Sequence, residues 1–490
     1  MKRGRALGKR STSASGGLGW NAVSAALPLV ASFVVSLVLA PWFGERLFGI
    51  YFLAMTVATL ALIPAKFGIQ VATSRLLSEH DDEPGPWLRS GLIARLAFTL
   101  PTAVLLVIAA PLVARWLESS DQETAFAMAA AVVISTSVFE FATEAMVGLR
   151  AFRAQVGARM VALALRLVAV FIVRFGGFSV VVFLAAHAVA ALLPGIVALV
   201  VLLNRCRGAA TMQKVRRTME VATPMAFASA SFLIYSHTDR LMLGWMHGPE
   251  LVGQFGVARN VIDAALFPAV ALTWSLRPAL VRALRDGGAA RMVPGLREGT
   301  RLSLLYVLLT VGLLAPIGDL LLPGLYDPEY RDAGLYFLGL LPVLAIRGVS
   351  TVIFPGMIAL DQQSAYGRLM GLTAVVNVAL NFALIPRFGA WGATLATGLA
   401  LVALTVGGIR HLRAAGCRGY IRNAVQDSWP GALAASAGCV VLLVARQQGL
   451  GWIGLFGLAL VTGLVSAGLI LRRWPPRLGP QSDPEGPVAP

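Results

Sequence analysis

Glu140 and Glu144 lie one helical turn apart inside a strongly apolar stretch of this 490-residue chain. Two like charges at this spacing repel each other on a helix, and a low dielectric constant strengthens the repulsion. Either an arginine therefore lies between the two carboxylates, or one of them keeps its proton. Arg95, in the preceding apolar stretch, is the arginine expected beside them in a structural role. The alternative is that the carboxyl groups exchange protons and couple the protein to a proton gradient.

A second charged group falls in two later apolar stretches. Arg259 and Asp263 have opposite signs and stand four residues apart, which predicts an ion pair on one helix face. Asp239 and Arg240 precede them, and Asp239 and Asp263 are further candidates for ion coupling. His237 either responds to pH or has no role at a membrane surface.

Arg166 and Arg347 fall near the middle of their apolar stretches. A charge at that depth is a candidate functional residue, although it can also pair with a neighbour or extend toward the membrane surface. The planar guanidinium binds phosphate oxygens in pairs. Arg166 and Arg347 are therefore the first candidates for binding a phosphate-bearing ligand, followed by Arg95 and Arg259.

Composition shows which elements must position these side chains. Hydrophobic residues make up 57% of the chain and charged residues only 13%, about half the share of a soluble protein. A membrane-crossing helix needs about 20 mostly apolar residues. The sequence offers fourteen such stretches, and alternation of period two is absent, so we predict an all-α membrane protein. Twelve or thirteen spans remain open, because the thirteenth stretch is short and the fifth holds Arg166. The stretches are 18–40, 48–66, 91–114, 124–148, 157–175, 178–203, 223–246, 255–276, 302–322, 334–358, 366–385, 389–409, 431–446 and 452–471.

The distribution of basic residues predicts the orientation. With a cytoplasmic N-terminus, 29 of the 41 Lys and Arg residues fall in the N-terminal arm and the loops on the same side, and 6 fall on the opposite side. This asymmetry follows the positive-inside rule and places both termini in the cytoplasm. The net charge of +17 is thereby explained without a nucleic-acid partner. The first apolar stretch is too long for the core of a signal peptide, so it is expected to be the first span.

An internal repeat divides the chain into two lobes. The 22 residues from Gly44 align without gaps with those from Gly248, at an offset of 204, and nine positions are identical. Each copy would hold six spans, and an even number gives both copies the same direction through the membrane. The expected segments are a basic arm (1–17), an N-lobe (18–203), a basic linker (204–222), a C-lobe (223–409), a basic loop (410–430), two added spans (431–471) and a disordered tail (472–490).

One motif predicts a tight helical hairpin. Pro386 is expected to end one span, because it lacks an N–H donor, and Gly389 to form the turn into the next. Small residues that follow, Gly392 and Thr397 among them, let helices pack closely in lipid. Asn377 and Asn381 precede the turn on the first helix of the hairpin.

These residues resemble the pattern NxxLNxxLIPxxGxxGAxxAT of the multidrug/oligosaccharidyl-lipid/polysaccharide flippase superfamily. The segments FGERLFGIYFLAMTVATLALIPAKFGIQVATSRLLSE and DRLMLGWMHGPELVGQFGVA resemble the polysaccharide-export members, the O-antigen and exopolysaccharide flippases. The resemblance covers about 400 residues, from the first span to the twelfth. It implies a flippase that moves a polyprenyl-pyrophosphate-linked oligosaccharide from the inner to the outer leaflet of a bacterial cytoplasmic membrane by alternating access. Polymerases and glycosyltransferases of the same pathway are the expected partners.

Three alternatives stay open. An ion-coupled multidrug antiporter of the same superfamily and a peptidoglycan lipid-precursor flippase would share much of this sequence pattern. A membrane glycosyltransferase or polymerase is the least favoured, because the outward loops are short, so we expect no enzyme. The three cysteines lack a paired spacing and no nucleotide-binding motif occurs, so neither a metal, a disulfide nor another cofactor is expected.

Overall fold

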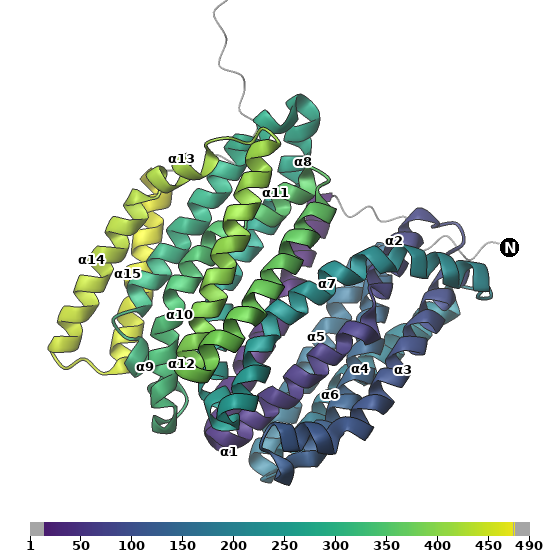
Figure 1. Ribbon diagram of the computed structural model, residues 1–490. Coiled ribbons are helices and arrows are strands. Elements are labelled where there is room, and N and C mark those ends of the chain that lie inside the picture. The colour runs from purple at the N-terminus through teal and green to yellow at the C-terminus, as the bar shows by residue number, and fades with distance from the viewer. Residues whose placement is uncertain (1–13, 474, 476–490) are drawn as a thin grey trace, which may run out of the picture. The chain divides into compact units, whose positions relative to one another are not determined.

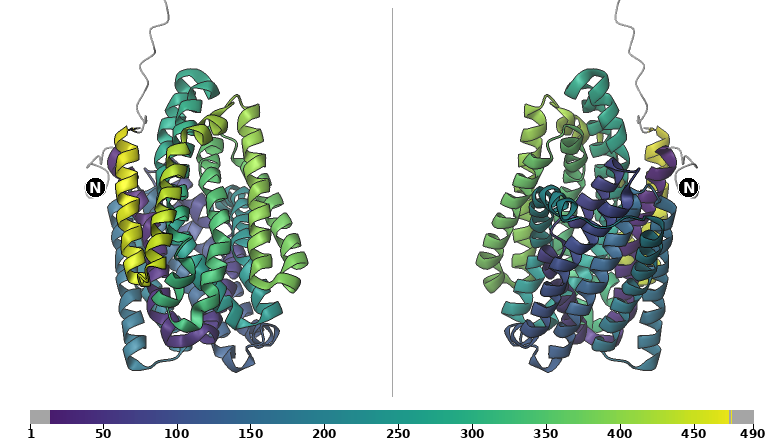
Figure 2. Two further views of the ribbon diagram at one scale, coloured as in Figure 1. Left: turned by 90° about the vertical axis from the view of Figure 1, so that its left-hand side faces the viewer. Right: turned by 90° about the vertical axis from the view of Figure 1, so that its right-hand side faces the viewer.

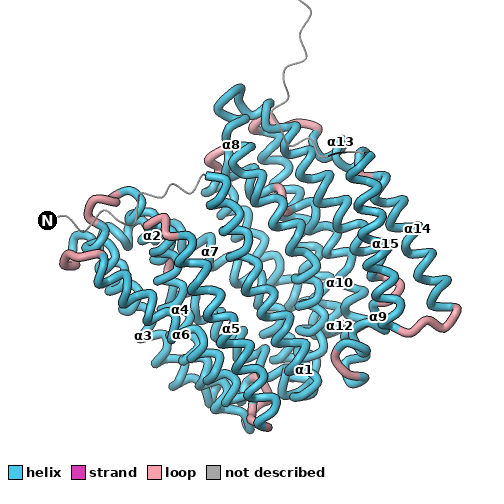
Figure 3. The backbone as a smooth tube through the Cα atoms, turned by 180° about the vertical axis from the view of Figure 1, so that it is seen from behind, coloured by secondary structure: helices cyan, strands magenta, loops and turns pink. Residues whose placement is uncertain are grey.

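The computed structural model describes residues 14–473 and 475, with side chains from Ser32 onward except at positions 228 and 274. All the regular secondary structure of its described part is helical, with short loops between the helices and no strand, as the sequence predicts (Figure 3). Most of the predicted basic arm and of the predicted disordered tail lies outside the described residues. At both ends the helices reach slightly beyond the predicted spans, since the first begins at Ala14 and the last ends at Arg473.

Fifteen α-helices and two short 3₁₀ turns follow one another along this described part (Figure 1). The α-helices are α1 (Ala14–Lys66), α2 (Ile69–Glu79), α3 (Pro84–Trp116), α4 (Glu123–Gly148), α5 (Phe152–Gly176), α6 (Val180–Arg205), α7 (Met212–His247), α8 (Pro249–Leu314), α9 (Gly318–Leu325), α10 (Arg331–Ser350), α11 (Ile353–Ala359), α12 (Gln363–Ala414), α13 (Tyr420–Asp427), α14 (Trp429–Gln447) and α15 (Trp452–Arg473).

Three of these helices are interrupted at glycines. The backbone leaves helical geometry at Gly44 in α1, at Gly287 and Gly288 in α8, and at Gly389 in α12. Ten helical stretches of the described residues are long and apolar enough to cross a membrane, and these three are among them. Dividing each of the three in two, and adding the more polar α7 as the predicted seventh span, accounts for fourteen segments.

The helices form two compact units. The first unit holds the described residues up to 267 together with 318–343 and 364–404, and the second holds 268–317, 344–363 and those from 405 onward. The lobe boundaries expected from the repeat stay a prediction.

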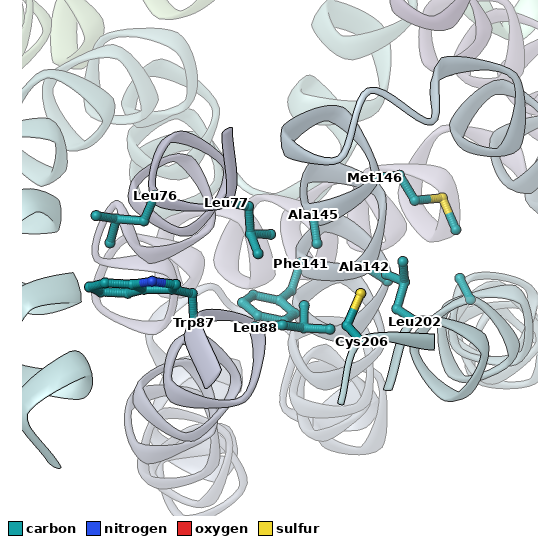
Figure 4. Close-up of a cluster of buried hydrophobic side chains, with 11 residues drawn as sticks. Leu76, Leu77, Trp87, Leu88, Phe141, Ala142, Ala145, Met146, Leu202 and Cys206 are labelled. Carbon is teal, nitrogen blue, oxygen red and sulfur yellow. The ribbon is translucent and has the colours of Figure 1, made fainter. Parts of the chain in front are cut away.

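In the first unit, α4 packs against both α3 and α6, while α1 packs against α5 and α7. A cluster of buried apolar side chains joins α2, α3, α4 and α6 at one end of these helices (Figure 4). In Figure 4, Phe141 of α4 lies between Leu77 of α2 and Leu88 of α3. Both leucines and Phe141 have 0% exposed surface, so these side chains pack against one another without access to water.

In the second unit, α14 and α15 lie side by side, in the yellow part of the colour range (Figure 2). Gly312 of α8 allows a close approach, since an added Cβ atom there would lie 2.6 Å from the Cβ of Ala435 in α14. Ile470 of α15 is buried against Leu305 and Leu309 of α8. The two added C-terminal helices are thus packed onto the second half of α8.

The internal repeat appears directly in the backbone. Gly44 has φ/ψ of 71°/172°, and Gly248, its counterpart, has 85°/171°. A Cβ atom added at Gly49 would lie 1.8 Å from the carbonyl oxygen of Pro249, and one added at Gly253 would lie 2.1 Å from that of Glu45.

Glu45 and Pro249 are themselves counterparts in the repeat, as are Gly49 and Gly253. Gly49 of the first copy contacts Pro249 of the second, and Gly253 of the second copy contacts Glu45 of the first. This reciprocal pattern is the one that a two-fold axis produces. We call these four residues the α1–α8 crossing. It shows the parallel pseudo-two-fold relation predicted from the sequence.

Polar groups cover the α1–α8 crossing. The Gln254 amide donates to a Glu45 carboxylate oxygen at 2.6 Å and to the Glu329 carbonyl at 2.7 Å, and its oxygen accepts from the Ala333 N–H at 2.8 Å. The Tyr330 hydroxyl donates to the carbonyl of Ala40 at 3.0 Å. These hydrogen bonds join α1, α8 and the start of α10 at the end of the helices where the crossing lies.

The predicted hairpin in α12 is also present. Gly389 has φ of 51°, which is the left-handed region that favours glycine. An added Cβ at Gly392 would lie 2.4 Å from the carbonyl oxygen of Leu384, so the two halves of the hairpin touch directly after the turn. Asn381 donates to Asn377 at 3.1 Å, and both side chains have 0% exposed surface.

Candidate functional site

The two acidic residues of α4 each have a cation of their own. Lys66, at the end of α1, forms an ion pair with Glu140 at 2.5 Å, and Arg159 of α5 forms one with Glu144 at 3.6 Å. The carboxylates remain about one-third exposed, at 32% and 30%. Two separate cations therefore take the place of the single arginine expected between the acids, and they relieve the repulsion across one helical turn.

Arg95 lies in the same region without contacting either carboxylate. Its side chain is 1% exposed, and it donates to the amide oxygen of Gln70 at 3.1 Å and to the hydroxyl of Ser137 at 3.2 Å. Ser137 precedes Glu140 by one turn of α4, and Glu140 is the carboxylate that acts electrostatically on Arg95. A buried guanidinium held by two neutral groups links α2, α3 and α4 and keeps a positive charge beside the acids.

The second charged group confirms the predicted ion pair. Arg259 Nε lies 3.5 Å from Asp263, one turn further along α8. Its Nη1 also lies 3.3 Å from Asp239 of α7, and the Arg259 and Asp239 side chains are only 4% and 1% exposed. Arg240, next to Asp239, places its guanidinium 5.6 Å from the centre of the Phe52 ring.

Both charged groups belong to the first unit. We call the ion pairs of α4, together with those of α7 and α8, the charged network. It contains all four predicted ion-coupling residues, Glu140, Glu144, Asp239 and Asp263.

Arg166 stands apart from this network. Its Nη2 contacts the Nε2 atom of His187 on the neighbouring helix α6. Since a guanidinium can only donate, the imidazole nitrogen is the acceptor in this contact. Tyr51 of α1 completes the surroundings, because its ring lies 5.4 Å from Phe183, whose ring is 6.2 Å from that of His187. No carboxylate among the described residues pairs with Arg166 within 4.0 Å.

Arg347 lies half-buried in the last turn of α10 and belongs to the second unit. The other three predicted anion-binding arginines, Arg95, Arg166 and Arg259, belong to the first unit. Sequence reasoning missed three members of the site, Lys66, Arg159 and His187. Lys66 and Arg159 are basic residues at the ends of apolar stretches, so the sequence alone did not distinguish them from the basic residues of the cytoplasmic loops. No local sequence pattern distinguished His187.

With this geometry in place, similarity to known proteins identifies the family. Residues 16–283 match the family described as "Polysaccharide biosynthesis protein". The chain belongs to this family. It is thereby a multi-pass membrane protein of the multidrug/oligosaccharidyl-lipid/polysaccharide flippase superfamily, as the resemblance of its motifs implies.

A named relative is the probable flippase AglR of Haloferax volcanii, which is 32% identical over 187 residues. That stretch covers 37% of this chain and 38% of the relative, so the similarity spans well under half of the relative's length. Relatives of this kind are flippases and transporters rather than enzymes, in agreement with the sequence prediction.

Two solved structures share the fold. One is described as lipid II flippase MurJ in an inward closed conformation, with a TM-score of 0.73 and 11% identity, covering 92% of this chain and 98% of that one. The other is a multidrug resistance MATE family transporter of the MOP superfamily in an inward-facing conformation, with a TM-score of 0.61 and 13% identity, covering 82% and 95%. At such identities the likeness concerns the fold alone.

Proposed function

We propose that this family member is a flippase for a polyprenyl-pyrophosphate-linked oligosaccharide, which it moves from the inner to the outer leaflet of the bacterial cytoplasmic membrane. Family membership and the named flippase relative support the transport of a lipid-linked saccharide. The observation that carries the choice of a pyrophosphate headgroup is the Arg166–His187 contact. There a guanidinium within a membrane-spanning helix faces a second basic side chain instead of a carboxylate.

A cation without an ionic partner is unfavourable inside the membrane, and a bound anion relieves this cost. Pyrophosphate suits the position, because a guanidinium binds two phosphate oxygens at once and a neighbouring imidazole can donate a further hydrogen bond. In this mechanism the arginine holds the pyrophosphate, the sugars cross within the protein and the polyprenyl chain stays in lipid. The network around Glu140 and Asp263 would supply the groups that couple the movement to an ion gradient.

Binding by the purified protein tests the headgroup assignment. We expect a polyprenyl-pyrophosphate-linked oligosaccharide to bind more tightly than a neutral glycolipid with the same sugars, and Arg166→Gln to remove most of the difference. Arg153→Gln is the matched control, because Arg153 is exposed at the start of the same helix. Equal affinity of the parent protein for both lipids would leave Arg166 without the proposed role.

Deletion of the gene in its host tests the substrate and the direction. We expect surface polysaccharide to be lost and lipid-linked oligosaccharide to accumulate on the cytoplasmic side. Normal polysaccharide combined with altered drug sensitivity would instead favour the multidrug antiporter.

A further inference from the structure

The tripeptide Arg-Phe-Gly occurs once in each copy of the internal repeat, at the turn between the last two spans of that copy. Arg174 begins it in the first copy, where α5 ends, and Arg387 begins it in the second, where the α12 hairpin turns. The orientation predicted from the basic residues places both turns on the outward side of the membrane. Both turns form with the same tripeptide, so the turn itself does not require any feature that only one of the two arginines has.

The two arginines have different surroundings. The guanidinium of Arg174 lies over the ring of Trp42, with its Cζ atom 4.2 Å from the ring centroid, and its side chain is half-buried. Trp42 lies in α1, and the position that matches it in the second copy, at the offset of 204, holds Met246. Arg387 is exposed. The first copy thus has an indole ring for its arginine at a position where the second copy has none.

The contact with the ring leaves the hydrogen-bonding capacity of Arg174 unused. Among the described residues, Arg174 forms no ion pair within 4.0 Å and no side-chain hydrogen bond. The five N–H donors of a guanidinium lie in its own plane, so a ring against one face does not occupy them. Trp42 is 38% exposed, so the pair is accessible from outside the protein. A planar cation of this kind binds two phosphate oxygens at once.

Arg174 follows Arg166 on the same helix, eight residues closer to the predicted outward end. At the rise and twist of an α-helix, the two positions are roughly 12 Å apart along the axis and roughly 80° apart around it. The groups that face the cations of α5 change in this direction. Arg159 faces a carboxylate, Arg166 an imidazole and Arg174 an indole ring. An anion that moves outward from Arg166 therefore reaches a second cation that no carboxylate neutralises.

We propose that Arg174 and Trp42 form a second anion site, which receives the pyrophosphate headgroup after it leaves Arg166 and from which the headgroup enters the outer leaflet. This inference rests on the proposed function, because it assigns the outward part of the same path. The phosphate of an ordinary bilayer phospholipid has the same chemistry as a ligand for Arg174. Only binding of the transported lipid, however, gives Arg174 a role in the rate of transport.

Transport by the full-length protein in lipid vesicles tests the assignment, with a polyprenyl-pyrophosphate-linked disaccharide as the probe at a series of concentrations. We expect Arg166→Gln to raise the probe concentration that gives half of the maximal rate, because it weakens the first binding step. Arg174→Gln should instead lower the maximal rate about tenfold at an unchanged half-saturating concentration, because it removes a charged hydrogen bond from the later part of the path. Arg387→Gln is the matched control from the second copy and should change neither quantity.

Two further variants separate a local effect from a loss of folding. Trp42→Leu should lower the maximal rate about two- to fivefold, the factor expected when an exposed cation–π contact is lost. Arg174→Lys keeps the charge without the planar fork, so it should recover only part of the rate that Arg174→Gln loses.

Three outcomes would overturn the proposal. The first is an equal effect of Arg174→Gln and Arg387→Gln on the maximal rate. The second is unchanged transport by Arg174→Gln together with a loss of bound phosphatidylglycerol in native mass spectrometry, since Arg174 would then hold a bilayer phospholipid. The third is an effect of Arg166→Gln alone, which would leave the proposed function standing. If neither Arg166→Gln nor Arg174→Gln changed transport, the proposed function would fail as well.

Discussion

The α1–α8 crossing leaves no room for a side chain at either of its glycines. An alanine at position 253 would place its Cβ 2.1 Å from the carbonyl oxygen of Glu45, well inside contact distance. The obstacle is backbone, so the two helices must separate to accommodate the methyl group. Overpacking of this kind typically costs about 1–3 kcal/mol. If the crossing opens and closes during transport, the added methyl group destabilises only the closed state, because the two helices touch only there.

A destabilisation of that size changes the ratio of open to closed states about 5- to 150-fold. Ala40 offers a reporter, because its side chain has 0% exposed surface and its carbonyl accepts the Tyr330 hydrogen bond beside the crossing. In a chain whose three natural cysteines have been replaced, we expect Gly253→Ala to raise the rate at which a maleimide labels Ala40→Cys. The increase should lie within the same 5- to 150-fold range.

Three further variants make this experiment decisive. Gly157 of α5 has nothing within 4 Å of an added Cβ, so Gly157→Ala should leave labelling unchanged. By the pseudo-two-fold relation, Gly49→Ala should act like Gly253→Ala. The double variant should add little to either, because helices already separated by one methyl group have room for the second. A labelling rate for Gly253→Ala equal to that of the parent would refute the account of the crossing as a closed, separable contact.

Three other outcomes follow from the geometry. Gly389→Ala should lower the thermal unfolding midpoint, because a left-handed backbone costs alanine about 1–2 kcal/mol, whereas Gly398→Ala, where a Cβ meets only ordinary contacts, should not. Glu140→Gln should destabilise the protein by about 1 kcal/mol, and a double-mutant cycle with Lys66→Gln should show coupling; additive effects would mean that the pair contributes nothing. Gln254→Ala should speed amide hydrogen exchange at the start of α10, because the Ala333 N–H would lose the Gln254 oxygen to which it donates; unchanged exchange would contradict this.

Backbone features were the most predictable part of this protein. The shared glycines of the repeat indicated a common geometry, and Gly44 and Gly248 adopt nearly the same φ and ψ. Likewise, Gly389 marked the turn of a hairpin that the structure contains, whereas Pro386, expected to end the span, lies inside the helix three residues before the break. The effect of such residues can be predicted from sequence because glycine widens, and proline narrows, the range of backbone dihedral angles, whatever the surroundings.

Contacts between distant helices were not predictable in the same way. The Arg259–Asp263 pair lies within one helix, so its spacing alone revealed it. Lys66 and Glu140 are separated by 74 positions, and only the packing of α1 against α4 brings them together. The spacing of residues along one sequence cannot distinguish such a pair from a cation and an acid that never come into contact.

Charge balance now separates the predicted anion-binding arginines of the first unit. Arg259 lies between Asp239 and Asp263, so an incoming phosphate would have to overcome repulsion from two carboxylates at 3.3 Å and 3.5 Å from the same guanidinium. Arg166 contacts His187 and has no carboxylate within 4.0 Å among the described residues, so a phosphate approaching it gains attraction without that opposition. Coulomb energies at these distances are several kcal/mol even at an effective dielectric constant of about 20. Arg259 is therefore better suited to pairing with its two carboxylates within the network, and Arg166 to receiving the anionic headgroup.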